Sequence, residues 1–131
     1  MGFDVRLTLG FESALEAVTA ALKTEGFGVL TRIDVRAVVK EKLGEVFRPF
    51  AILGACNPAL AHAALSSDAR VGLMLPCNVV VEQRPDGVWA SLVNPDVMLG
   101  VGSLSQNAEV RRVAADARAR LERVAAILQQ G

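Results

Sequence analysis

One apolar stripe runs along the last quarter of the chain and constrains the fold more than any other pattern. The residues Val110, Val113, Ala117, Leu121, Val124 and Leu128 keep helical spacing over about five turns. Asn107, just before them, is a favoured helix N-cap, because its side-chain oxygen accepts from the unpaired amides of a first helical turn. A helix this long with one apolar face needs a broad apolar surface to cover. The stripe therefore predicts a helix that packs on a sheet.

Strand-type segments supply that sheet. Phe3 to Leu9 alternates apolar and polar residues without a break, which is the period of a strand with one buried face. Cys77 to Gln83 has a continuous β-branched centre, which predicts a place in the middle of the sheet. The Pro-Asp-Gly turn signal after it joins it to the next strand as a hairpin. The other strand-type segments are Phe27 to Ile33, Phe50 to Ala55 and Val88 to Val93.

Helical patterns separate the strands. Ser13 and Glu16 have the spacing of a capping box, which predicts that Ser13 caps the first helix. Asp34 is placed to cap a second helix, and Pro58 opens a third. The order is a strand, a helix, four strands and a long final helix, with extra helices between the strands. It predicts a two-layer α+β fold in which helices cover one face of an antiparallel sheet. Residues 1–131 contain no linker or repeat, so we expect a single domain.

Composition limits the classes of partner. Lys and Arg number 14 and Asp and Glu also number 14, which argues against nucleic acid as a partner. No apolar run approaches the ~20 residues of a membrane span, so no membrane partner is expected. The first residues lack the basic and apolar stretches of a secretory signal, which indicates a cytoplasmic location. In that compartment two cysteines are more often reduced than bridged.

The segment around Cys56 predicts a strand that turns into a helix. Asn57 is a favoured N-cap, and Pro58 suits the first helical position because its missing amide costs nothing there. Cys56 then lies ahead of a helix N-terminus, where free amides and the helix dipole favour thiolate and predict a lowered pKa. Cys77 opens the next strand. The ten residues 67–76 span up to ~33 Å, enough for the two cysteines to meet at one edge of the sheet.

Three interpretations of this edge stay open. The first is a thiol site, in which Cys56 and Cys77 bind a soft metal such as Cu(I), bind zinc together with His62 and water, or form a redox pair. The second is a site for a small anion, held by backbone amides of the turn at Gly54–Pro58 and lined by Asn57 and Asn78. The third is a structural or regulatory homodimer without chemistry.

The cysteines and the histidine also have purely structural interpretations. Cysteine is often buried as a small hydrophobic residue, and a lone histidine on a helix is usually a surface residue. The chain has no GxSxG elbow, Walker A loop or GxGxxG motif, and His62 lies too far into its helix to point at Cys56. We therefore assign no catalytic residue, favour binding over enzymatic activity, and leave the cofactor open. The predicted ligand-binding residues are Cys56, Asn57, Cys77 and Asn78, and the predicted metal ligands are Cys56, Cys77 and His62.

Several strings resemble one known family. These are Gly26-Phe27-Gly28-Val29, Ile33-Asp34-Val35, Leu53-Gly54-Ala55-Cys56-Asn57-Pro58 and Leu75-Pro76-Cys77-Asn78-Val79. Over nearly the whole chain the sequence resembles the domain of unknown function 302 family of small bacterial and archaeal proteins. The resemblance implies a fold like that of TATA-binding protein, with the element order derived above, and it implies homodimers. It implies no activity.

Overall fold

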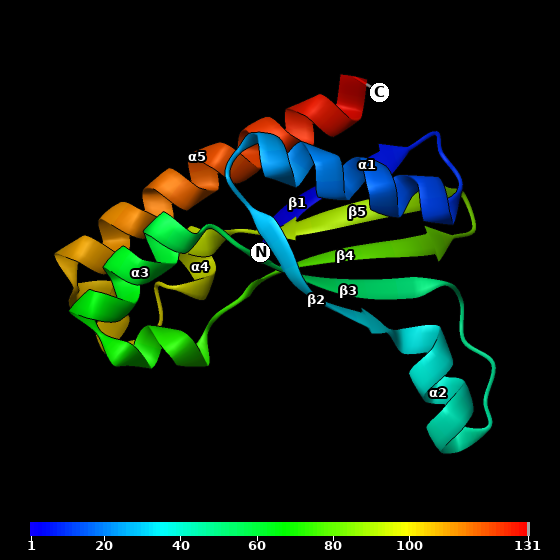
Figure 1. The fold of residues 1–131 in the computed structure, drawn as a ribbon, viewed down its shortest axis with the longest axis horizontal. Helices are drawn as coiled ribbons and strands as arrows, with labels where there is room; N and C mark the ends of the chain where they lie inside the picture. The colour runs from blue at the N-terminus through cyan, green and yellow to red at the C-terminus, as the bar shows by residue number, and fades with distance from the viewer. Residues whose placement is uncertain (131) are drawn as a thin grey trace.

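The computed structural model describes residues 1–130 and contains one five-stranded sheet. All neighbouring strands are antiparallel, and their order is β1-β5-β4-β3-β2 (Figure 1). The strands are β1 Gly2–Leu7, β2 Gly28–Asp34, β3 Phe50–Cys56, β4 Cys77–Arg84 and β5 Gly87–Val93. The β-branched strand β4 takes the central position of the sheet, as predicted, with β5 on one side and β3 on the other.

Two helices form the second layer. Figure 1 shows α1 (Phe11–Thr24) and α5 (Ala108–Gln130) lying together along one side of the sheet. Alternate strand residues face them, so that Val79 and Val81 of β4 are fully buried whereas Val80 between them is not. Every residue of the predicted stripe on α5 is buried. The predicted two-layer α+β fold is confirmed.

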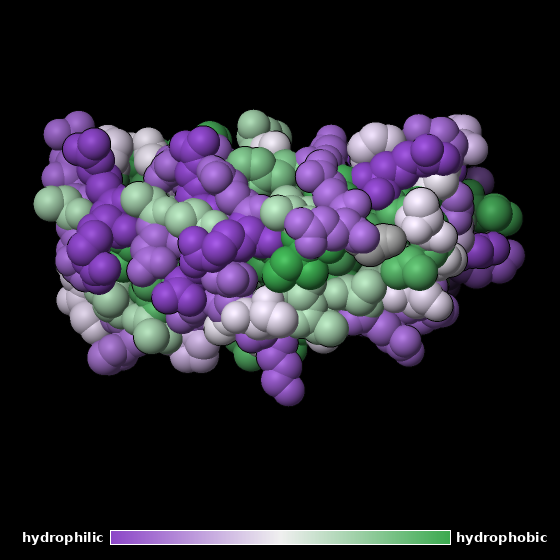
Figure 2. Space-filling model, turned by 90° about the horizontal axis from the view of Figure 1, so that it is seen from above, coloured by the Kyte–Doolittle hydropathy of each residue, from purple (hydrophilic) through white to green (hydrophobic). Residues whose placement is uncertain are grey.

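The outward side of α5 is polar. Ion pairs one turn apart link Arg118 to Glu122 and Arg120 to Asp116 at 2.8 and 2.9 Å. Such exposed pairs stabilise a helix by only a few tenths of a kcal/mol each. Figure 2, a view from above, shows hydrophilic and apolar side chains interspersed along the whole length of the molecule.

The first helix begins earlier than predicted. Gly10 is its N-cap residue and makes no side-chain hydrogen bond, and the Ala14 amide donates to the Gly10 carbonyl at 2.8 Å. Ser13 therefore lies inside the first turn, and the prediction that it caps the helix was wrong. The reason is that Phe11 packs against the core from within the helix, which draws the start of the helix ahead of the capping-box residues.

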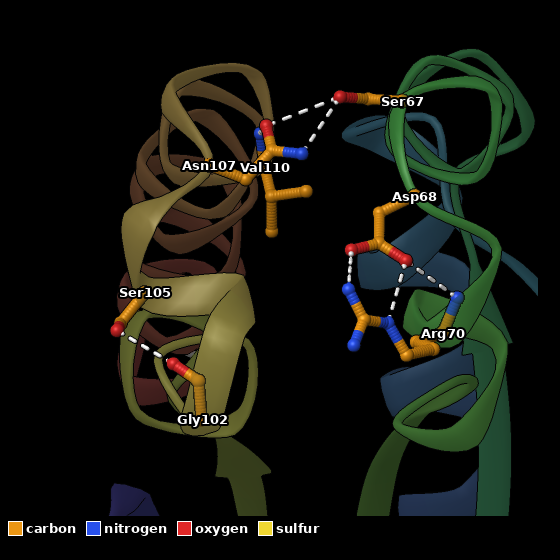
Figure 3. A network of polar contacts seen from close by, with 7 residues as sticks. All are labelled: Ser67, Asp68, Arg70, Gly102, Ser105, Asn107 and Val110. Atoms are coloured by element: carbon orange, nitrogen blue, oxygen red, sulfur yellow. Dashed lines mark hydrogen bonds and ion pairs between the residues drawn. The ribbon is translucent and has the colours of Figure 1, made fainter.

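A smaller hydrophobic cluster lies at the end of the sheet where β4 begins. It is built by α3 (Pro58–Ser67), α4 (Pro95–Met98) and the 3-10 helices η1 (Ala69–Leu73) and η2 (Gly102–Gln106), against the first turns of α5. Figure 3 shows the polar link between them: Asn107 donates to Ser67 Oγ at 2.9 Å and accepts from the Val110 amide at 3.1 Å. Asn107 thus caps α5, as predicted, and fixes the end of α3 beside it.

The helix α2 (Val35–Leu43) stands apart from both clusters. Asp34 caps it, accepting from the Ala37 amide at 3.0 Å, and Gly44 ends it with φ of 67°. None of its residues is buried, and Leu43 is 71% exposed. In Figure 1 it projects beyond the ends of the strands, away from α1 and α5. Its apolar side chains therefore cover no core of their own chain.

Two leucine-to-alanine changes test this assignment of the core. Leu121 is fully buried under the sheet, whereas Leu73 is 83% exposed in η1. We expect Leu121→Ala to lower the free energy of unfolding by about 2–5 kcal/mol, because it removes buried methyl groups and leaves a cavity. Leu73→Ala should change it by less than about 0.5 kcal/mol. Urea unfolding curves measure both, and equal losses would contradict the fold.

Candidate functional site

The two cysteines lie at one end of the sheet. Cys56 is the last residue of β3 and Cys77 is the first of β4, and in the ladder Ala55 stands directly opposite Cys77. Between them the chain leaves the sheet through α3 and η1 and returns to the same end. The structure therefore places Cys56 and Cys77 on adjacent strands, and neither forms a disulfide.

A small cavity lies beneath this end of the sheet. Cys56, Asn57 and Cys77 line it, and the rest of the lining is apolar, including Phe27, Leu60, Ala64, Leu75, Leu99 and Val113. Its volume is about 30 Å³. One water needs about 10–15 Å³ measured in this way, whereas small organic ligands occupy sites of roughly 300–1,000 Å³. The cavity has room for one or two waters or a single ion, and an organic molecule does not fit.

Asn57 is buried and holds three elements together. Its Oδ1 accepts from the Leu60 amide at 3.3 Å, which confirms it as the N-cap of α3. Its Nδ2 donates to the Glu25 carbonyl at 3.3 Å, and Arg120 donates to the same oxygen at 3.2 Å. These bonds join the start of α3 to the end of α1 and to α5. The polar atoms of Asn57 are thus already engaged within the protein.

Asn78 lies on the other side of the sheet. Successive residues of a strand point to opposite faces, so Cys77 is buried under the helices while Asn78 is exposed on the outer face, opposite Gly54. Asn78 is not among the residues that line the cavity, so the structure does not bring it together with Cys77 as expected.

The predicted anion cradle is also not formed. The predicted strand from Phe50 to Ala55 is present and extends as far as Cys56, with Gly54 paired to Thr31 on one side and Asn78 on the other. A side chain at Gly54 would collide with Thr31 Oγ1 and the Pro76 ring, so glycine is needed for these strands to approach. The backbone there belongs to the sheet ladder and presents no turn of free amides to an anion.

His62 is exposed on α3 and does not line the cavity. Among residues 1–130 no three His, Cys, Asp or Glu side chains come together to hold a metal ion. The zinc site of Cys56, Cys77 and His62 is therefore not assembled in this structure.

Both thiols are held in the neutral form. Burial raises the pKa of Cys56, and burial together with the nearby Cys56 charge raises the pKa of Cys77 to about 11. The predicted lowering of the Cys56 pKa was wrong. Pro58 brings no amide to the helix N-terminus, and the Leu60 amide is donated to Asn57, so little is left there to stabilise a thiolate against its apolar surroundings.

Comparison with known proteins assigns the family. The family model described as "Domain of unknown function DUF302" matches residues 3–128. The chain belongs to the DUF302 family. It is similar to the crystal structure of an uncharacterized conserved DUF302 protein from Bacillus stearothermophilus, with a TM-score of 0.83 and 32% identity. The alignment covers 98% of this chain and 96% of that one. No curated protein matches the chain.

Family membership agrees with the resemblance seen in the cysteine-containing strings, and it carries the fold with it. It does not extend to an activity. Within residues 1–130 no helix is both long and apolar enough to cross a membrane. The part of the site that the sequence did not reveal is its apolar lining, because Leu99 and Val113 come from α4's end and α5 and carry no local signal for a contact with Cys56.

Thiol reactivity tests the burial of the DUF302 cysteines. With a pKa of about 11, only about one Cys77 thiol in a thousand is ionised at pH 8, so its reaction with a disulfide reagent should be slow in the native protein. Cys56, which is only half-buried, should react first. We expect both rates to rise steeply from pH 7 to 10, measured separately in Cys56→Ser and Cys77→Ser. Rapid labelling of Cys77 at pH 7 in folded protein would contradict this description.

Proposed function

We propose that Cys56 and Cys77 bind a single soft metal ion of the Cu(I) class, in a reducing compartment such as the cytoplasm. The observation that carries this proposal is that Cys56 and Cys77, at the ends of adjacent strands, both line a cavity of about 30 Å³ whose other lining residues have no charge. A site of this size suits an ion better than any organic ligand. Its only two side chains with strong affinity for a metal are sulfur ligands.

The number of ligands favours a monovalent soft ion. Structural zinc takes four protein ligands and catalytic zinc takes three, whereas this site offers two. Thiolate ligands select Cu(I), which accepts low coordination numbers. Two S–H bonds break, two sulfur–copper bonds form, and two protons leave to solvent. The bound unit then carries one negative charge.

Competition titrations test this proposal. We expect one Cu(I) per chain in reduced wild-type protein, with the affinity lowered at least ~10-fold in Cys56→Ser and in Cys77→Ser. His62→Ala is the matched control and should bind as wild type, because His62 lies outside the cavity. Since two protons are released, the affinity should rise about 100-fold for each pH unit between pH 6 and 8. Equal binding by the double serine variant, or no binding by wild type, would sink the proposal.

We also propose that the chain functions as a homodimer, because within residues 1–130 helices α1 and α5 cover only one face of the sheet. A sheet with a half-apolar outer face is stabilised when a partner removes that face from water. The homodimer is independent of the metal site, and a measurement of the mass of the protein in solution tests it.

A further inference from the structure

The sheet face turned away from α1 and α5, here termed the open face, has an apolar centre. Ile33 stands opposite Ile52 in the ladder, and Ile52 stands opposite Val80, so an aliphatic row crosses β2, β3 and β4. None of the three side chains is buried, and Ile33 is 48% exposed. Other side chains of the open face include Asp4, Arg6, Asn78, Glu82, Trp89 and Ser91.

The helix α2 with residues 44–46, here termed the arm, is a second apolar surface that stays largely exposed. Val38, Leu43 and Val46 are exposed, and no residue of α2 is buried. Isolated helices shorter than about 12–15 residues are marginal in water, and most helices in proteins are stabilised by packing one apolar face. The nine residues of α2 contact β2 and β3 but bury none of their side chains there, so a further contact would stabilise the helix.

We propose that the open face and the arm together form the interface between two copies of this chain, related by a twofold axis. This inference rests on the proposed homodimer and names the surface that forms it. In such an interface the same patch meets itself, so it must be self-complementary in charge as well as apolar at its centre.

The charges of the open face meet that requirement. Glu82 accepts from Arg84 at 3.2 Å and lies 3.5 Å from Arg48, and Arg84 stacks over Trp89 at 4.7 Å. Asp4 and Arg6 add one charge of each sign at the other side of the face. Arginine and aromatic side chains are enriched at the energetic centres of protein interfaces. Acidic groups and an aliphatic centre do not suit nucleic acid, which requires cations and stacking platforms.

Surface area indicates that both parts take part. The chain exposes 7237 Å², whereas a compact monomer of 13.9 kDa exposes about 6,700 Å². Five strands about 4.8 Å apart and some six residues long give the open face a projected area of roughly 500 Å². A stable interface needs about 800 Å² from each partner. The open face supplies the larger share of such an area, and the proposed interface includes the arm as well.

Sedimentation equilibrium on matched variants tests the interface. Wild type should have twice the 13.9 kDa chain mass. Ile52→Lys, at the centre of the aliphatic row, should weaken dimerisation at least ~30-fold, and Ile33→Lys about 10-fold. Ile127→Lys is the control, since Ile127 is 42% exposed on α5, on the helical side of the molecule. Leu43→Lys in the arm should also weaken the dimer, whereas Leu73→Lys in η1 should not.

Trp89 gives a second readout that needs no substitution. It is the only tryptophan of the chain and lies on the open face. When wild-type protein is diluted, its emission should shift to longer wavelength and become more easily quenched by iodide, at the concentration where the mass falls by half. This readout decides the matter if Ile52→Lys fails to fold, which its melting curve will show.

The outcomes separate the two proposals. A mass of one chain at every concentration up to millimolar would overturn both the homodimer and its interface. A dimer that Ile127→Lys disrupts and Ile33→Lys does not, or one that dissociates without any change at Trp89, would overturn the interface alone. Loss of the dimer in the open-face variants, with both controls unaffected, supports the interface.

Discussion

The burial of the α5 stripe against the sheet determines which side of every strand meets water. Because strand side chains alternate, packing Val79 and Val81 under the helices places Val80 on the opposite face. The same alternation buries Cys77 and exposes Asn78. The positions of the thiol cavity and of the open face therefore both depend on which side of β4 packs against the helices. A shift of β4 by a single residue would turn each of its side chains to the opposite face.

Much of this architecture can be predicted from the sequence, because it depends on periodicity. The alternation of Phe3–Leu9 and the stripe on α5 each specify an element and the face it buries, whatever the distant contacts are. The caps Asn57 and Asn107 could be predicted equally well, since capping is decided within one helical turn, and both cap helices in the structure. The family strings around Cys56 and Cys77 pointed to the correct family, and the Cys56 string combines a strand end with a cap.

The failures concern contacts between distant segments. Ser13 and Glu16 match a capping box, but Phe11 packs against the core as the first residue of the helix. The helix therefore begins ahead of Ser13. Cys56 stands before a helix N-terminus, yet burial beside side chains from α4 and α5 raises its pKa. The backbone of Gly54–Pro58 suggested an anion site, although Gly54 lies in the sheet ladder and its lack of a side chain allows the approach of Thr31 and Pro76. In each case the local pattern was read correctly, and a neighbour far along the chain determined the result.

The central claim is that alternate residues of β4 face two different partners, the chain's own helices and a second copy. Methyl NMR with a soluble paramagnetic probe measures this most directly. Val79 and Val81 should stay protected from the probe at all protein concentrations, whereas Val80 should be protected only at concentrations where the protein is dimeric. Relaxation of Val80 that does not depend on protein concentration, or strong relaxation of Val79 and Val81, would contradict the account.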